Sequence, residues 1–161
     1  MVGAKLKIKG PEPFLISNHL YGPSYISLDA ALSWYGFIPE QVFGVTAVTT
    51  KTSRIISNSA GLFEYVHLPL PYYAYGIAQI KLSDDQFVMM ACPEKALCDK
   101  IITTSGLQLK GIKSTTAYLL EDLRIDEEMC KTLNILLMKE WLENTPKKES
   151  LKILINTLEK L

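Results

Sequence analysis

The residues of this 161-residue chain with the clearest potential for chemistry are Glu94, Lys95 and Asp99. Lys95 and Asp99 are four positions apart, so on a helix the ammonium group and the carboxylate are close enough to pair. Together with Arg54, the three residues are candidates to line a polar cleft. The alternative is structural, with Glu94 stabilising the positive end of a helix and Lys95 forming an ordinary side-chain pair with Asp99. We favour the structural interpretation, because helix electrostatics account for all three residues.

Other patterns that would identify a catalytic or metal site are absent from the sequence. A metal-dependent nuclease of the restriction-enzyme type needs an acidic residue and a lysine spaced as Glu-x-Lys, and no such triplet occurs. His19 and His67 lie in different segments without other ligands at metal-binding spacing, which favours a structural role for each. Cys92, Cys98 and Cys130 form no CxxC motif and are expected to be free thiols. We therefore expect no metal, no cofactor and no enzymatic activity.

Tyr72, Tyr73 and Tyr75 form an aromatic cluster beside prolines. The cluster has the composition of a base-stacking platform or an interface anchor. A loop packed over a sheet accounts for it as well, and we favour that interpretation.

The hydroxyl-rich segment 49–54 contains two cations, Lys51 and Arg54, and suits contacts with phosphate groups. It is equally compatible with an ordinary solvated hairpin turn. The candidate functional surface therefore consists of Lys51, Arg54, Tyr72, Tyr73, Tyr75, Glu94, Lys95 and Asp99.

One helix has both of its ends marked in the sequence. Leu28, Ala31 and Leu32 recur at helical spacing, and Ser27 precedes them at the N-cap position, where its hydroxyl is expected to accept a backbone N–H. Gly36 can adopt the left-handed conformation that ends the helix.

Alternating and β-branched runs predict strands over residues 45–50, 54–57, 62–68, 77–82 and 87–91. Helical patterns cover residues 14–21, 93–105, 115–123, 127–142 and 148–161. Short turns between successive strands favour an antiparallel or mixed sheet over βαβ crossovers. We expect a single α+β domain over residues 1–161, with a mixed or mainly antiparallel sheet covered by helices in residues 1–110 and a helical C-terminal region in residues 111–161.

The composition is that of an ordinary globular protein, with 48% hydrophobic and 21% charged residues. The formal net charge is zero, which excludes a chain-wide basic field for nucleic acid but leaves a local patch possible. No apolar run has the length of a membrane span, and the N-terminal residues alternate with lysines and lack an apolar signal core. We therefore expect a cytoplasmic protein.

Several sequence blocks, taken in order, resemble the AbiEi family of antitoxins from type IV toxin–antitoxin systems. The resemblance covers about residues 15 to 105 and is carried by the order and spacing of the blocks. They are Leu20-Tyr21-Gly22-Pro23-Ser24-Tyr25-Ile26-Ser27-Leu28, Ala31-Leu32-Ser33-Trp34-Tyr35-Gly36-Phe37-Ile38-Pro39-Glu40, Val48-Thr49-Thr50-Lys51-Thr52, Asn58 with Gly61 and Phe63-Glu64-Tyr65, and Pro93-Glu94-Lys95-Ala96-Leu97-Cys98-Asp99.

The resemblance implies a bacterial antitoxin of phage defence by abortive infection, which counteracts a nucleotidyltransferase-like toxin without requiring a stable complex. Such antitoxins repress their own operon through an N-terminal winged helix and neutralise the toxin with the C-terminal domain. About two dozen residues precede Tyr25, too few for a winged helix. The resemblance is therefore to the C-terminal antitoxin domain, either as part of a longer protein or as a short family member. The alternative function is a DNA-binding regulator of its own operon, with Lys5, Lys7, Lys9, Lys51 and Arg54 as its basic residues.

Overall fold

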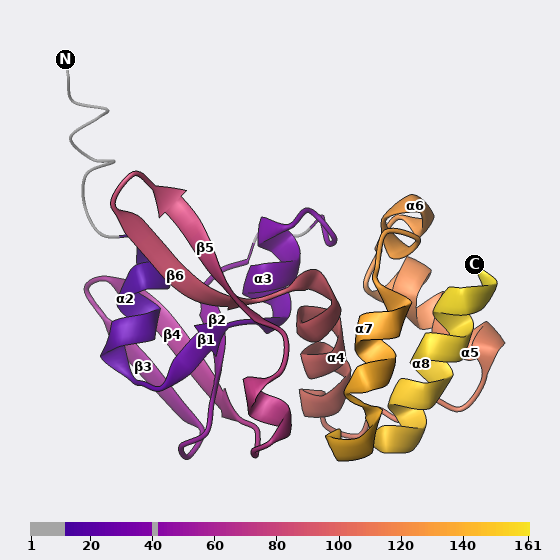
Figure 1. Cartoon of the computed structure of the whole chain (residues 1–161). Helices are drawn as coiled ribbons and strands as arrows, with labels where there is room; N and C mark the ends of the chain where they lie inside the picture. Colours follow the sequence, from indigo (N-terminus) through magenta and orange to yellow (C-terminus); the bar gives the residue numbers. More distant parts are fainter. Residues whose placement is uncertain (1–11, 40–41) are drawn as a thin grey trace.

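The computed structural model describes residues 12–39 and 42–161, so Lys5, Lys7, Lys9 and Glu40 lie outside the described residues. The fold is α+β, as expected, with a six-stranded mixed sheet, helices that pack on it and a helical C-terminal region. The strands are β1 (Ser24–Ile26), β2 (Val45–Thr49), β3 (Arg54–Asn58), β4 (Gly61–His67), β5 (Ile77–Ser83) and β6 (Gln86–Ala91). The sheet and the C-terminal helices lie on opposite sides of α4 (Pro93–Thr103) (Figure 1).

The strand order is β3-β4-β2-β1-β6-β5. The pairs β1–β2, β3–β4 and β5–β6 are antiparallel, whereas β1–β6 and β2–β4 are parallel. The predicted turns at residues 58–61 and 83–86 are confirmed as the tight connections of β3 to β4 and of β5 to β6. The hairpin interpretation of segment 49–54 is wrong, because β4 lies between β2 and β3 and the segment crosses over it.

The predicted helical segments are confirmed in type, but one of them is interrupted. The remaining helices are α2 (Pro13–Leu20), α3 (Leu28–Trp34), α5 (Ile112–Ala117), α6 (Glu127–Cys130), α7 (Ile135–Glu140) and α8 (Lys148–Lys160), with short 3-10 turns η1 (Tyr72–Ala74) and η3 (Leu142–Asn144) and a π turn η2 (Tyr118–Asp122). The predicted helix over residues 127–142 breaks between α6 and α7. Asn134 starts α7 there, since its side-chain oxygen accepts the backbone N–H of Leu137 at 3.1 Å.

α3 begins and ends where the sequence predicts, but its N-cap residue acts differently. Ser27 is the N-cap residue, yet its hydroxyl makes no capping hydrogen bond and instead donates to Asp99 at 2.7 Å. The expected capping contact is therefore wrong. Gly36 has a φ of 81°, which confirms the left-handed end of the helix.

α4 is buried on nearly all sides, and its apolar residues form the middle of the core. Leu97 and Ile101 are fully buried, as are Leu154 of α8 and Ile26 of β1. All three cysteines are free, as expected, and burial raises the pKa of Cys92 and of Cys130 to about 11. None of the described helices is both long and apolar enough to cross a membrane.

Candidate functional site

The structure divides the eight predicted site residues into two groups. Six lie on or against α4, namely Tyr72, Tyr73, Tyr75, Glu94, Lys95 and Asp99. Lys51 and Arg54 lie at the surface, at the ends of the crossover between β2 and β3. The polar cleft that would combine Arg54 with Lys95 and Asp99 is not formed, because Arg54 is exposed and contacts Tyr21, whereas Lys95 and Asp99 are buried.

Asp99 is the centre of a buried polar cluster that consists of Tyr25, Ser27, Tyr72, Lys95 and Asp99. Its Oδ2 accepts hydrogen bonds from the hydroxyls of Tyr25 and Ser27, both at 2.7 Å. Its Oδ1 accepts a hydrogen bond from the Tyr72 hydroxyl at 2.8 Å. Tyr25 and Ser27 are two positions apart on extended backbone, so their side chains point to the same side. Three hydroxyls from two distant segments therefore hold one carboxylate that is inaccessible to water.

Lys95 is also fully buried, and backbone carbonyls hold its ammonium group. Its Nζ donates to the carbonyl oxygens of Tyr72 and Tyr73 at 3.0 Å each, and also to that of Tyr75. An ammonium group has three protons, so these carbonyls use all of them. The same Nζ lies 4.4 Å from the ring centroid of Tyr72 and 4.8 Å from that of Tyr25, within the range of cation–π attraction.

The pKa shifts in the cluster follow from burial and from the opposite charges. Burial lowers the pKa of Lys95, and the charge of Asp99 partly offsets that effect. Burial raises the pKa of Asp99, while Lys95 and the three hydroxyl donors oppose the shift. Burial and the nearby carboxylate raise the pKa of Tyr25 and of Tyr72, which keeps both hydroxyls protonated. The cluster is therefore a closed network of buried groups that serve as hydrogen-bond partners or countercharges for one another.

The structural interpretation of these residues is supported, but in a different form from the ordinary side-chain pair that the spacing predicts. Lys95 and Asp99 attract each other electrostatically, yet each has its own set of hydrogen-bond partners within the core. Glu94 is buried as well, and its carboxylate accepts the backbone N–H of Asn134 at 2.7 Å. It therefore connects the N-terminus of α4 to the start of α7.

The tyrosines of η1 are packed rather than presented to solvent. Tyr72 and Tyr73 are buried, and the Tyr73 ring lies 5.0 Å from that of Tyr25 on β1. The half-buried Tyr75 accepts a hydrogen bond from the Asn144 side chain at 2.9 Å. The burial of Tyr72 and Tyr73 supports the interpretation as a packed loop over that as a base-stacking platform.

Lys51 and Arg54 converge on Tyr21, and we call these three residues the Tyr21 patch. The Lys51 Nζ lies 5.2 Å and the Arg54 Cζ 5.3 Å from the centroid of the Tyr21 ring. The Tyr21 hydroxyl donates to the backbone carbonyl of Thr52 at 2.9 Å, and its ring packs edge-on against Tyr65 at 5.1 Å. The two cations are thus positioned by one aromatic ring that is itself fixed.

His67 supports the same crossover, which agrees with its expected structural role. Its Nδ1 lies 3.1 Å from the carbonyl oxygens of both Thr50 and Lys51, and its backbone N–H donates to the Ser53 hydroxyl at 2.9 Å. Nowhere in residues 12–39 and 42–161 do three His, Cys, Asp or Glu side chains gather as a metal ion would require.

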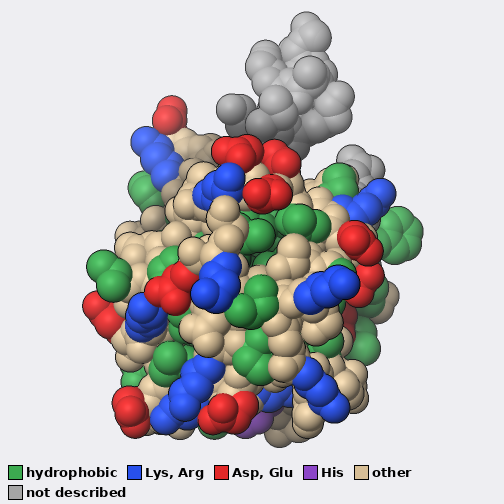
Figure 2. All heavy atoms as spheres, turned by 90° about the vertical axis from the view of Figure 1, so that its right-hand side faces the viewer, with side chains coloured by type: hydrophobic (Ala, Val, Ile, Leu, Met, Phe, Trp, Pro, Cys, Tyr) green, Lys and Arg blue, Asp and Glu red, His purple; other side chains and the backbone are tan. Residues whose placement is uncertain are grey.

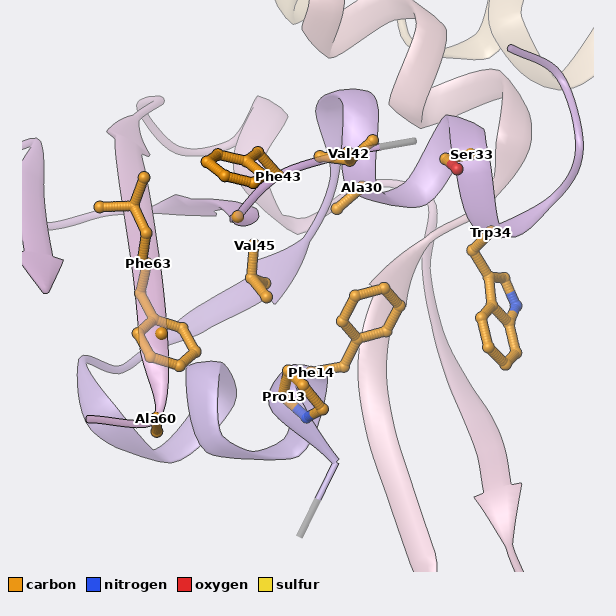
Figure 3. Close-up of a pocket in the computed structure, with 13 residues that line it drawn as sticks. Pro13, Phe14, Ala30, Ser33, Trp34, Val42, Phe43, Val45, Ala60 and Phe63 are labelled. Carbon is orange, nitrogen blue, oxygen red and sulfur yellow. The ribbon is translucent and has the colours of Figure 1, made fainter. Parts of the chain in front are cut away.

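A groove of about 510 Å³ lies between α2, α3 and the β2–β4 region (Figure 3). Phe14 and Trp34 pack edge-on at 5.8 Å on one side of it, and Phe43 and Phe63 lie on the other. The described residues that line it include no acid, base or thiol. The described lining of the groove therefore suits contact with apolar groups.

Sequence reasoning missed four contributors to these sites. Tyr25 and the Ser27 hydroxyl complete the buried cluster, and their spacing of two on an extended segment was a usable signal for a shared polar partner. Tyr21 and Gly76 carried no such signal. Gly76 has a φ of 65°, and a Cβ there would lie 2.9 Å from both the Lys95 Cβ and the Trp141 ring.

Comparisons of the chain with protein-family models, with curated proteins and with solved structures give no match.

Proposed function

We propose that this chain is a non-catalytic antitoxin domain of a bacterial type IV toxin–antitoxin system, which acts in the cytoplasm against a nucleotidyltransferase-like toxin. The observation that carries the proposal is the meeting of two sequence blocks at Asp99. Tyr25 and Ser27 belong to the first block of the AbiEi resemblance and Asp99 to the last, and they are bonded to each other across 74 and 72 positions. Distant residues that resemble one family thus form a single structural unit.

The chemistry of the described residues supports a binding role over a catalytic one. Lys95 and Asp99 are buried, and internal partners occupy their polar atoms. The described residues that line the groove between α2, α3 and the β2–β4 region have apolar or hydroxyl side chains, or are glycine. If the chain were instead an enzyme that acts on nucleotides, Glu94→Gln and Lys95→Ala would abolish a measurable turnover. We expect both variants to change the free energy of unfolding alone.

The decisive experiment is a growth assay in which the nucleotidyltransferase-like protein encoded beside this chain's gene is induced with and without the chain. We expect co-expression to restore growth. The matched controls are an empty vector and a toxin with a disabled nucleotidyltransferase site. Persistent toxicity, with both proteins present at equal levels in the soluble fraction, would refute the antitoxin proposal.

One observation favours a second function, the DNA-binding regulator of its own operon. Lys51 and Arg54 are exposed and lie close together on the Tyr21 ring. A regulator would retard its own promoter fragment more strongly than a scrambled fragment of equal length, and the binding would weaken with salt. Equal retardation of both fragments would argue against this function.

A further inference from the structure

The crossover from β2 to β3 is held in place at both ends, although much of it is exposed. Thr49 donates its hydroxyl proton to the Pro23 carbonyl at 2.7 Å and accepts the Lys51 backbone N–H at 3.1 Å. His67 and Tyr21 contact the carbonyls of residues 50–52, as described above. Side chains that a fixed backbone and an aromatic ring already order lose less freedom when they bind a ligand.

The charge around the Tyr21 patch is positive, in contrast to the neutral whole chain. Residues 42–68, which include β2, β3 and β4, contain Lys51 and Arg54 but a single carboxylate, that of Glu64. Glu64 pairs with Ile55, whereas Arg54 pairs with Tyr65, so Glu64 and Arg54 point to opposite faces of the sheet. The face formed by the C-terminal helices differs, because both signs of charge are interspersed there (Figure 2).

We propose that the Tyr21 patch binds the backbone phosphates of a single-stranded nucleic acid. An arginine can donate two parallel hydrogen bonds to one phosphate, and a lysine can contact another as a point charge. Phosphates repeat along a nucleic-acid strand, so this ligand can contact two separate cations at once. Two cations held on one ring therefore suit a nucleic acid better than a ligand that carries a single carboxylate. Lys51 and Arg54 are the two charged donors of the patch, so we expect phosphate contacts to dominate the binding.

The test is fluorescence anisotropy of the purified chain with labelled 12-nucleotide oligo(dT) and oligo(U) over a range of salt concentrations. The key variant is Lys51→Gln/Arg54→Gln, and the matched control is Lys110→Gln/Lys113→Gln, which removes two exposed charges elsewhere. We expect the key variant to weaken binding at least tenfold and the control less than twofold. Removal of two phosphate contacts should reduce the slope of log K against log salt by about 1.4.

Further arms separate the other sources of phosphate. Competition with GTP and with inorganic phosphate detects a site for free nucleotide or free anion, and a hairpin duplex detects preference for double strands. Binding of GTP without binding of either oligonucleotide would overturn the proposal, as would tighter binding of the hairpin duplex than of the oligonucleotides, or equal affinities of wild type and key variant. The assay contains no toxin, so its outcome is independent of the antitoxin proposal. Circular dichroism of each variant confirms that the fold is retained.

Discussion

Lys95 and Lys147 perform the same structural task at two places in the chain. Lys95 donates to three carbonyls at η1, and Lys147 donates to the carbonyls of Ile101, Thr104 and Leu107 at 3.1, 2.9 and 2.8 Å. Carbonyls at the C-terminal end of a helix lack intrahelical donors, and a cation satisfies them and also complements the helix dipole. The two sites differ in exposure, since Lys95 is fully buried and Lys147 is half-buried.

This difference predicts unequal effects of the same substitution. Lys95→Met removes the ammonium donor from three carbonyls, of which that of Tyr72 also accepts the backbone N–H of Tyr75. It also leaves the buried Asp99 without its countercharge, and we expect a loss of about 3–5 kcal/mol in the free energy of unfolding. Lys147→Met removes a half-buried cation, and the Thr104 carbonyl keeps the Leu107 backbone N–H, so we expect a loss of about 1–2 kcal/mol. Urea unfolding of both variants measures the values. Equal losses would contradict the assignment of Lys95 to a closed buried network.

The raised pKa of Asp99 predicts an unusual pH dependence. Because burial raises this pKa, the folded protein binds the proton more tightly than the unfolded chain. The stability that Asp99 contributes in this way is fully present below its pKa in the unfolded chain. It is lost as the pH rises through its pKa in the folded protein. Most paired carboxylates behave in the opposite way.

We therefore expect the wild type to gain stability relative to Asp99→Asn as the pH falls from 7 to 4. The lowered pKa of Lys95 acts in the same direction, since in the variant no carboxylate offsets the effect of burial on that lysine. Denaturation of both proteins at several pH values measures the difference. If the difference in the free energy of unfolding is constant, or shrinks on acidification, the pKa of Asp99 is not raised in the folded protein.

At the scale of elements, local patterns predicted most helices and strands but not their partners. The five longer strands were visible as β-branched or alternating runs. β1 was missed, because it has three residues and all of them are buried, so no alternation marks it. The strand order depends on contacts between distant segments, and turn lengths alone could not place β4 between β2 and β3. In the same way, helical spacing predicted that Lys95 lies beside Asp99. It could not predict the hydroxyl groups that reach Asp99 from η1 and from β1 and the residue after it.

The approach of β5 to α4 depends on Gly76, and a matched pair of substitutions tests this contact. Gly76 and Gly106 both have positive φ, 65° and 77°, but only at Gly76 would a Cβ meet other atoms. We expect Gly106→Ala to cost about 1–2 kcal/mol from backbone strain alone. Gly76→Ala adds overpacking against Lys95 and Trp141, and we expect about 2–4 kcal/mol in total. Thermal unfolding compares the two variants. Equal losses in the free energy of unfolding would mean that the side chains around Gly76 can accommodate a Cβ without destabilising the protein.

At the scale of the whole molecule, polar contacts join the sheet to the C-terminal helices through α4. Asp99 connects α4 to β1, Glu94 connects it to the start of α7, and Lys147 connects its C-terminal end to the start of α8. The buried apolar core includes residues of the sheet, of α4 and of the C-terminal helices, and α4 lies between the other two parts (Figure 1). These contacts are distributed along the length of α4. Unfolding of either the sheet or the C-terminal helices would therefore expose groups of α4 that are buried against the part that remains folded.

The two tryptophans provide a direct test of this coupling, because each reports on a different part. Trp34 is half-exposed at the end of α3, and Trp141 is buried beside α7 in the helical region. We expect the Trp141 fluorescence of a Trp34→Phe variant and the far-ultraviolet circular dichroism of the same protein to give urea midpoints within about 0.1 M of each other, as two-state unfolding requires. An earlier Trp141 transition would show that the helices beyond α4 unfold separately. In that case the chain would comprise two units of stability, and the contacts of Glu94 and Lys147 would be too weak to couple them.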